Sequence, residues 1–263
     1  MNIGFIGCGN MGGAIAKAIS AKKQSNIYIY DLNTEKAAAF AESIGAKSVD
    51  RDELLSLCDI TFLGVKPNII LPLLSEIAPR VKKGALLVSM AAGVKLASLT
   101  ECAKDVPFIR IMPNTPVTLG EGMTAYAASS CTTDKQIADF QKIYSACGTL
   151  ARLEEEKIDA FCAIAGCGPA YAYMFIDALA KAGENIGLDR SDAIVYAATM
   201  LRGSALMALE SGLDPVTLRK NVCSPGGSTI EGVKVLEARG IESIVDETIA
   251  AAYKRTVELG KQN

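Results

Sequence analysis

Histidine is absent from this 263-residue sequence, and tryptophan is absent as well. Without imidazole the chain has no Ser-His-Asp or Cys-His hydrolase centre and no histidine-ligated zinc or haem site. Dehydrogenases that use imidazole as acid or base are excluded for the same reason. Any proton transfer must therefore use a carboxylate, a lysine, a tyrosine, a cysteine, a hydroxyl group or water.

Strong net charge and long apolar runs are lacking too. The balance of 27 Lys+Arg against 29 Asp+Glu gives no electrostatic footprint for nucleic acid or an anionic membrane. The longest strongly apolar stretch, around Ala85–Val94, is too short to span a bilayer, and Met1 is not followed by a secretory signal pattern. The eight cysteines form no C-x-x-C pair, which favours reduced thiols over zinc ligands or disulfides. We expect a cytoplasmic protein that holds no metal and binds neither nucleic acid nor membranes.

Up to about Leu153, short β-rich runs alternate with helix-like stretches. Continuous apolar strands separated by helices are typical of a parallel sheet covered on both faces. We predict a Rossmann-like, doubly wound parallel α/β domain over residues 1–153. The expected strands are Asn2–Ile6, Ile27–Tyr30, Ile60–Gly64, Leu86–Ser89 and Phe108–Met112, and the expected helices are Gly13–Ala21, Glu35–Ile44, Ile69–Ala78 and Leu96–Ala103.

From Glu154 onward the strand pattern ends, and residues 154–263 are predicted to form an all-α domain. Phe161–Ala180 and Ala193–Leu209 are too apolar for a thin bundle in water, so we expect a second subunit to cover them. The expected helices are Ile158–Ala182, Asp192–Ser211, Pro215–Asn221, Thr229–Ala238 and Ser243–Leu259, with Gly212 and Gly240 as end signals.

The run Gly7-Cys8-Gly9-Asn10-Met11-Gly12 matches G-x-G-x-x-G between the first strand and the first helix. Gly7 permits the tight turn, Gly9 lets a pyrophosphate approach the backbone, and Gly12 allows close helix–strand packing. The N–H groups of the helix N-terminus would then face the phosphates. The context indicates a dinucleotide-binding loop, and a purely structural glycine turn is the lesser alternative.

Asp31 ends the second strand, where an acid hydrogen-bonds the adenosine ribose and repels a 2′-phosphate. This favours NADH over NADPH, although Asp31 could equally start a turn in which Asn33 or Thr34 caps the next helix. Val65-Lys66-Pro67 and Ala91-Ala92-Gly93 also follow strands, at the edge of an open sheet where ligands bind. Near a cofactor, Lys66 would simply complement phosphate charge.

A second loop, Asn221-Val222-Cys223-Ser224-Pro225-Gly226-Gly227-Ser228-Thr229, precedes a predicted helix. Ser228 and Glu231 fit an S-x-x-E capping box, which predicts a helix start near Thr229. The glycines free the backbone to fold over a ligand, and the first helical N–H groups could cradle a small carboxylate. An ordinary capped helix after a loop is the alternative.

These motifs resemble those of the pyrroline-5-carboxylate reductase family, and the resemblance covers the whole chain. Ser-Pro-Gly-Gly-x-Thr and Met112-Pro113-Asn114-Thr115-Pro116 are specific to that family, whereas the glycine loop is shared with many enzymes. The resemblance implies a Rossmann domain followed by a helical domain that interlocks in a homodimer, often assembled into decamers. It also implies NAD(P)H-dependent reduction of 1-pyrroline-5-carboxylate to L-proline, commonly with NADPH.

The resemblance implies two sets of contact residues. The cofactor set comprises Ile6, Gly7, Cys8, Gly9, Asn10, Met11, Val65, Lys66, Pro67, Ala91, Ala92, Gly93 and Asn114, to which the ribose argument adds Asp31. The substrate set comprises Glu155, Asn221, Ser224, Gly226, Gly227, Ser228 and Thr229. Thr229, or a water that it orders, would supply the ring-nitrogen proton, and Glu155 would favour the protonated imine.

One turn departs from the family pattern, because Ala165 and Cys167 stand where serines are usual. Two other functions remain open. A β-hydroxyacid dehydrogenase shares the opening motif but needs a helical lysine where this chain has Ala172. A dinucleotide-sensing regulator would need no carboxylate-shaped second loop.

Overall fold

The computed structural model describes residues 1–260, which form two compact units. Within the described residues, one unit comprises residues 1–169 and 252–260, and the other comprises Ala170–Ala251. The predicted division after Leu153 was drawn where the strand pattern ends, and it stays a prediction about domain boundaries.

The first unit is built on one eight-stranded sheet with the order β3-β2-β1-β4-β5-β6-β7-β8. All neighbours are parallel except β6 and β7, where Ile109 is paired with Ala128 in antiparallel register. The strands are β1 (Asn2–Ile6), β2 (Asn26–Tyr30), β3 (Lys47–Ser48), β4 (Ile60–Leu63), β5 (Leu86–Ser89), β6 (Phe108–Met112), β7 (Gly122–Ala128) and β8 (Gly148–Arg152).

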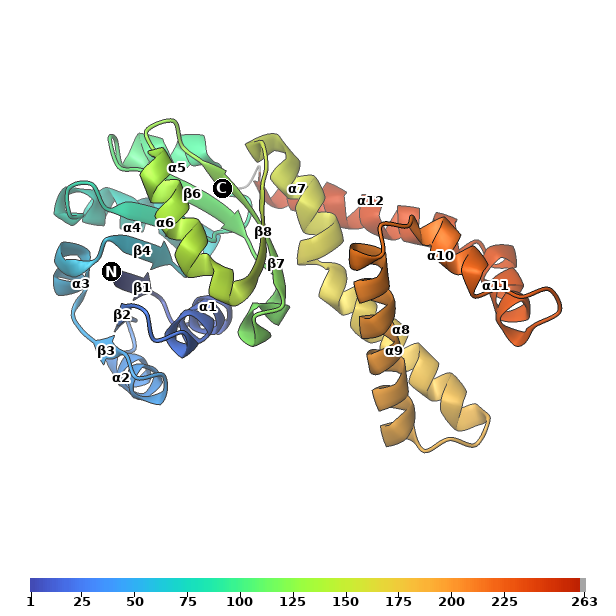
Figure 1. Cartoon of the computed structure of the whole chain (residues 1–263). Coiled ribbons are helices and arrows are strands. Elements are labelled where there is room, and N and C mark those ends of the chain that lie inside the picture. The colour runs from blue at the N-terminus through green and yellow to red at the C-terminus, as the bar shows by residue number, and fades with distance from the viewer. Residues whose placement is uncertain (261–263) are drawn as a thin grey trace. The chain divides into compact units, whose positions relative to one another are not determined.

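Helices pack on both faces of this sheet (Figure 1). Helices α1 (Asn10–Ala21), α2 (Thr34–Ser43) and α6 (Asp134–Tyr144) enclose a core in which Phe5 stacks on Phe62. Helices α3 (Arg51–Leu57), α4 (Pro67–Ile77) and α5 (Leu96–Cys102) enclose the core on the other face. The doubly wound α/β prediction is confirmed.

The structure adds three strands and two helices that the sequence pattern did not predict, namely β3, β7, β8, α3 and α6. Strand β7 reads Gly-Met-Thr-Ala-Tyr-Ala-Ala, which has little β-branched content, and its stability comes from pairing with β6 and β8. Helix α6 begins with a capping box between Thr133 and Gln136, a pattern that was visible in the sequence. The sheet is therefore mixed at one edge rather than purely parallel.

After β8 every element of the chain through Gly260 is helical, as predicted, and this region covers the whole second unit together with the last elements of the first unit. The expected helix Ile158–Ala182 is divided: α7 (Ile158–Phe161) leads into a π-helical turn, Cys162–Gly166, before α8 (Gly168–Asn185) begins. The remaining helices are α9 (Arg190–Glu210), α10 (Pro215–Asn221), α11 (Ser228–Ala238) and α12 (Ile241–Gly260). Gly212 and Gly240 have φ of 71° and 72°, the left-handed conformation expected just after a helix end.

Large apolar side chains remain exposed along α8 and α9. Met174 is 76% exposed on α8, and Tyr196 is 57% exposed on α9. By length and composition alone, the stretches Glu155–Asn185 and Arg190–Glu210 could cross a membrane, so Ala85–Val94 was too narrow a choice of apolar segment. Exposed apolar side chains gathered along two helices are typical of an interaction surface.

Candidate functional site

The glycine loop lies where β1 ends and α1 begins. Gly7 has φ of +94°, and its N–H donates to the Tyr30 carbonyl at 2.7 Å, which closes the turn against β2. Gly9 is the N-cap of α1 and provides no side chain, so the first N–H groups of the helix keep no side-chain acceptor. A Cβ built on Gly9 would meet nothing within 4 Å. The loop therefore has the open, donor-rich cradle that a pyrophosphate requires.

Gly12 has the opposite role, because it packs against backbone. A Cβ at Gly12 would collide with the Gly7 carbonyl oxygen and lie 3.6 Å from the Gly64 Cα. A Cβ at Gly64 would in turn lie 2.7 Å from the same Gly7 oxygen. The close approach of helix α1 to β1 and β4 thus depends on Gly12.

Substitutions at Gly12 and Gly9 should have separable effects, the first on stability and the second on dinucleotide binding. We expect Gly12→Ala to destabilise the fold by about 1–3 kcal/mol, because the clash is with backbone and not with a flexible side chain. Gly9→Ala should leave the melting temperature close to wild type yet weaken dinucleotide binding about tenfold or more, since its methyl group fills the cradle. Thermal melting and fluorescence titration with NADH and NADPH measure the two effects. Equal melting temperatures for the two variants would contradict this division.

Asp31 follows β2 and starts the turn there, which is one of its two predicted roles, while its ribose contact stays a prediction. Its Oδ2 accepts hydrogen bonds from the Cys8 N–H at 3.0 Å and from the Cys8 thiol at 3.4 Å, and its Oδ1 accepts from the Asn33 N–H at 3.1 Å. Asn33 caps α2 through the Lys36 N–H. Burial alone would raise the pKa of Asp31, but the backbone hydrogen bonds from Cys8 and Asn33 outweigh it and lower the pKa. The result is a charged carboxylate fixed beside the glycine loop.

The other predicted cofactor residues follow neighbouring strands of the same sheet. Val65–Pro67 follow β4, and Lys66 is the N-cap of α4 with Pro67 in its first turn. Ala91–Gly93 follow β5, and Asn114 comes two residues after β6. Because β1, β2, β4, β5 and β6 are parallel, all these segments lie at one edge of the sheet. The side chains of Ile6 and Cys8 are buried, so these two residues offer a ligand mainly backbone atoms.

Both polar atoms of the Asn114 side chain are hydrogen-bonded within the protein. Its Nδ2 donates to the Ala165 carbonyl at 3.0 Å, and its Oδ1 accepts from the Met123 N–H at 2.9 Å. The Cys167 N–H donates to the Cys162 carbonyl at 2.8 Å and closes the π-helical turn. The turn therefore uses the backbone of Ala165 and Cys167, which explains how it is kept without the usual serine side chains.

Glu155 lies in a short 3₁₀ turn after β8, within the first unit. Its Oε1 accepts from the Leu96 N–H at 2.7 Å and from Arg110 Nη1 at 3.0 Å. Arg110 also donates from Nη2 to Asp159 Oδ1 at 3.2 Å, and its side chain is 2% exposed. Sequence reasoning missed Arg110, although a lone charge within the apolar strand Phe-Ile-Arg-Ile-Met indicates a buried partner.

The second predicted loop lies wholly in the helical unit and is exposed. Gly226 has φ of +72°, and the Gly227 N–H donates to the Ser224 carbonyl at 3.0 Å, which turns the chain into α11. Asn221 is the last residue of α10. Thr229 is the second residue of α11, so its hydroxyl lies beside the free N–H groups of the first turn.

The predicted capping box at this loop is wrong. The N-cap is Gly227, which makes no side-chain capping hydrogen bond, and the helix starts at Ser228 rather than Thr229. Glu231 Oε1 instead accepts from Lys234 Nζ at 2.7 Å, one turn further along. The uncapped first turn leaves more N–H groups free for a ligand than a capping box would.

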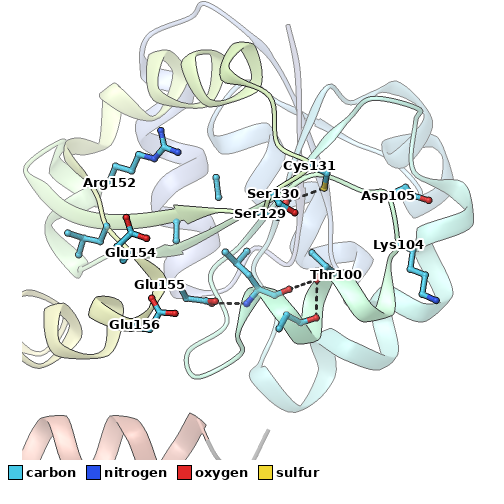
Figure 2. A pocket seen from close by; sticks show the side chains of 15 residues that line it. Thr100, Lys104, Asp105, Ser129, Ser130, Cys131, Arg152, Glu154, Glu155 and Glu156 are labelled. Atoms are coloured by element: carbon cyan, nitrogen blue, oxygen red, sulfur yellow. Dashed lines mark hydrogen bonds between the residues drawn. The ribbon is translucent and has the colours of Figure 1, made fainter.

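The first unit also has a groove of about 640 Å³, which lies apart from the glycine loop (Figure 2). Thr100 and Lys104 lie on one side, and Arg152 and Glu154 lie on the other. Glu155 is the single predicted site residue in its lining, and the Glu155 carboxylate is bonded to the Leu96 N–H there. The groove contains no part of the glycine loop.

Comparisons with known proteins match both units. Residues 2–93 match the family described as NADP oxidoreductase, coenzyme F420-dependent, and residues 155–259 match the pyrroline-5-carboxylate reductase dimerisation family. The fold and the glycine loop thus define a dinucleotide-dependent oxidoreductase with a helical dimerisation region.

Full-length relatives narrow this class. The chain is 39% identical to the pyrroline-5-carboxylate reductase of Escherichia coli and 36% identical to that of Pisum sativum, covering 98% of this chain and 98% and 95% of theirs. A Coxiella burnetii reductase structure matches with a TM-score of 0.91 at 31% identity over 98% of both chains. A Plasmodium falciparum reductase structure with NADP bound matches with a TM-score of 0.89 at 29% identity over 99% of this chain and 98% of that one. This chain belongs to the pyrroline-5-carboxylate reductase family.

Proposed function

We propose that this chain catalyses the NAD(P)H-dependent reduction of 1-pyrroline-5-carboxylate to L-proline. The observation that carries the proposal is the full-length similarity to reductases of that name, which includes both the glycine loop and the Ser224–Thr229 loop. The dehydrogenase and sensor alternatives explain neither the helical match over residues 155–259 nor the second loop.

The dinucleotide is proposed to bind at the carboxyl edge of the parallel strands. The cradle at Gly9 and the uncapped start of α1 fit a pyrophosphate, and the Asp31 carboxylate fits the ribose hydroxyls. The proposed contacts are Ile6, Gly7, Cys8, Gly9, Asn10, Met11, Asp31, Val65, Lys66, Pro67, Ala91, Ala92, Gly93 and Asn114. The bound cofactor supplies the hydride.

The substrate carboxylate is proposed to bind the backbone of Gly226–Thr229, where a positive φ and an uncapped helix start leave N–H donors exposed. Asn221, Ser224 and Ser228 would complete this pocket. Hydride adds to the imine carbon while the ring nitrogen keeps or gains one proton, so atoms and charge balance. The Thr229 hydroxyl, or a water that it orders, stabilises that proton.

The absence of histidine is compatible with this chemistry. A protonated imine is already a good hydride acceptor, so positioning contributes more than acid–base machinery. The test is the decrease in nicotinamide absorbance when purified protein, NAD(P)H and 1-pyrroline-5-carboxylate are mixed. Turnover of short β-hydroxyacids in place of this imine would favour the alternative dehydrogenase.

We also propose that a second copy of the chain covers the apolar faces of α8 and α9. The match to a dimerisation family over these helices supports a homo-oligomer rather than a membrane span. Assembly of dimers into decamers and a cytoplasmic location remain predictions.

Residues 1–260 contain eight cysteines, all of which are free thiols in the structure.

A dimer that buries α9 should be weakened by charged side chains introduced on this helix. We expect Met200→Glu combined with Met207→Glu on α9 to raise the dimer dissociation constant about 10²-fold or more, because each buried carboxylate would lack a partner. Lys17→Glu on the exposed face of α1 adds a similar charge elsewhere and should leave the mass unchanged. Size-exclusion chromatography with light scattering measures both, and a monomeric wild-type chain at micromolar concentration would refute the dimer.

A further inference from the structure

Strand β6 carries a buried arginine, Arg110, that the proposed reaction does not use. Arg110 is the largest fully buried side chain in the described residues, and it lies between two carboxylates from the segment that follows β8. A buried arginine is costly unless its hydrogen bonds are made, and here Nη1 and Nη2 each reach a different acid. Its Nε has no partner within residues 1–260. Such an arrangement is poorly explained by stability alone.

The three charged residues join segments that are far apart in the sequence. Arg110 lies two residues before Met112, where the Met112–Thr115 segment begins. Glu155 accepts a hydrogen bond from the N–H of Leu96, the first residue of α5, three residues after the Ala91–Gly93 loop ends. Lys95, the N-cap of α5, makes no side-chain capping bond, so the Glu155 carboxylate replaces that cap from another element.

The third connection runs through Asp159 on α7. Three residues later the π-helical turn begins, and its Ala165 carbonyl accepts the hydrogen bond from Asn114. Asn114 in turn holds Met123 of β7. One buried charge therefore links the loop after β5, the loop after β6 and the π-helical turn.

We propose that Arg110, Glu155 and Asp159 form an ionic clamp that fixes the spacing of the Ala91–Gly93 and Met112–Thr115 loops, and that Glu155 is a positioning residue rather than a substrate contact. The inference rests on the proposed function, in which Ala91–Gly93 and Asn114 of these loops contact the dinucleotide. Glu155 Oε1 already serves two donors, and Arg110 balances its charge, so its electrostatic effect on an iminium would be small.

The test compares four variants of the full-length protein. Glu155→Ala removes the acceptor for Leu96 and Arg110, whereas Glu155→Gln keeps one. Asp159→Asn weakens the ion pair between Arg110 and Asp159. Glu156→Ala is the matched control, because Glu156 is the exposed neighbour in the same 3₁₀ turn. The readouts are the dinucleotide dissociation constant without substrate, kcat, KM for the imine, and the pH profile of kcat/KM.

We expect Glu155→Ala to weaken dinucleotide binding and to lower kcat by about 10- to 10²-fold, with a smaller effect on KM for the imine. Glu155→Gln should recover most of the loss with a pH profile like wild type, and Glu156→Ala should match wild type. If Glu155→Ala does not fold, the Glu155→Gln and Asp159→Asn profiles decide the question.

The inference is overturned if Glu155→Gln is as impaired as Glu155→Ala and its pH profile is displaced, because that pattern belongs to direct stabilisation of the iminium. It is also overturned if Glu155→Ala binds dinucleotide and turns over like wild type. A wild-type protein without reductase activity would instead refute the proposed function, while the dinucleotide measurement would still report on the clamp.

Discussion

Replacing Thr229 by valine is expected to lower kcat/KM for 1-pyrroline-5-carboxylate by about 10²–10⁴-fold, the usual contribution of a positioned proton donor. Valine keeps the shape of threonine and removes the hydroxyl beside the free N–H groups of α11. The loss should fall mainly on kcat, because the backbone that is proposed to hold the carboxylate is unchanged. Steady-state kinetics with either dinucleotide measure the effect.

Thr229→Ser is the matched control, since it restores the hydroxyl without the methyl group. We expect this variant to remain within about threefold of wild type, and thermal melting should show that both variants are folded. A Thr229→Val enzyme that stayed within about threefold of wild type would remove Thr229 from the proton-transfer step.

Replacing Asp31 by serine is expected to shift the ratio of kcat/KM for NADPH and NADH toward NADPH by about tenfold or more. The carboxylate repels a 2′-phosphate at this position, and the Lys36 ammonium group is 3.7 Å from Asp31 Oδ2. Once Asp31 is neutral, Lys36 is free to pair with that phosphate instead.

Asp31→Asn separates charge from geometry, because an amide oxygen can still accept from the Asn33 or Cys8 N–H. It should shift the preference in the same direction as serine with less loss of overall affinity. Since the pKa of Asp31 is lowered, the preference of the wild type should stay constant from about pH 7 to about pH 9. A wild type that prefers NADPH, with Asp31→Asn unchanged, would show that Asp31 serves only the loop.

Much of the first unit followed from sequence because its strands are continuous apolar runs. The runs at Asn2–Ile6, Leu86–Ser89 and Phe108–Met112 have the same bounds in the structure. Strand β7 was missed because its alanines carry no β-branched pattern and its pairing is tertiary. A strand of this kind is specified by the strands on either side of it rather than by its own residues.

The site was predictable where local sequence alone determines geometry. The positive φ of Gly7 and Gly226 and the open space at Gly9 agree with the tasks inferred from the motifs. The capping box at Ser228 failed because the helix begins one residue earlier than expected, with Gly227 as its N-cap, so Ser228 lies inside the first turn. The hydrogen-bond partners of Glu155 could not be predicted from local sequence, because Leu96 and Arg110 are 59 and 45 residues away along the chain.

The most direct test of the account is the transfer of hydrogen from cofactor to imine. Purified protein is mixed with 1-pyrroline-5-carboxylate and with NADH or NADPH that carries deuterium on the transferring face of the nicotinamide ring. The account predicts oxidation of the cofactor and L-proline with one deuterium at the former imine carbon. No oxidation of either cofactor at any pH, or proline without the label, would contradict it.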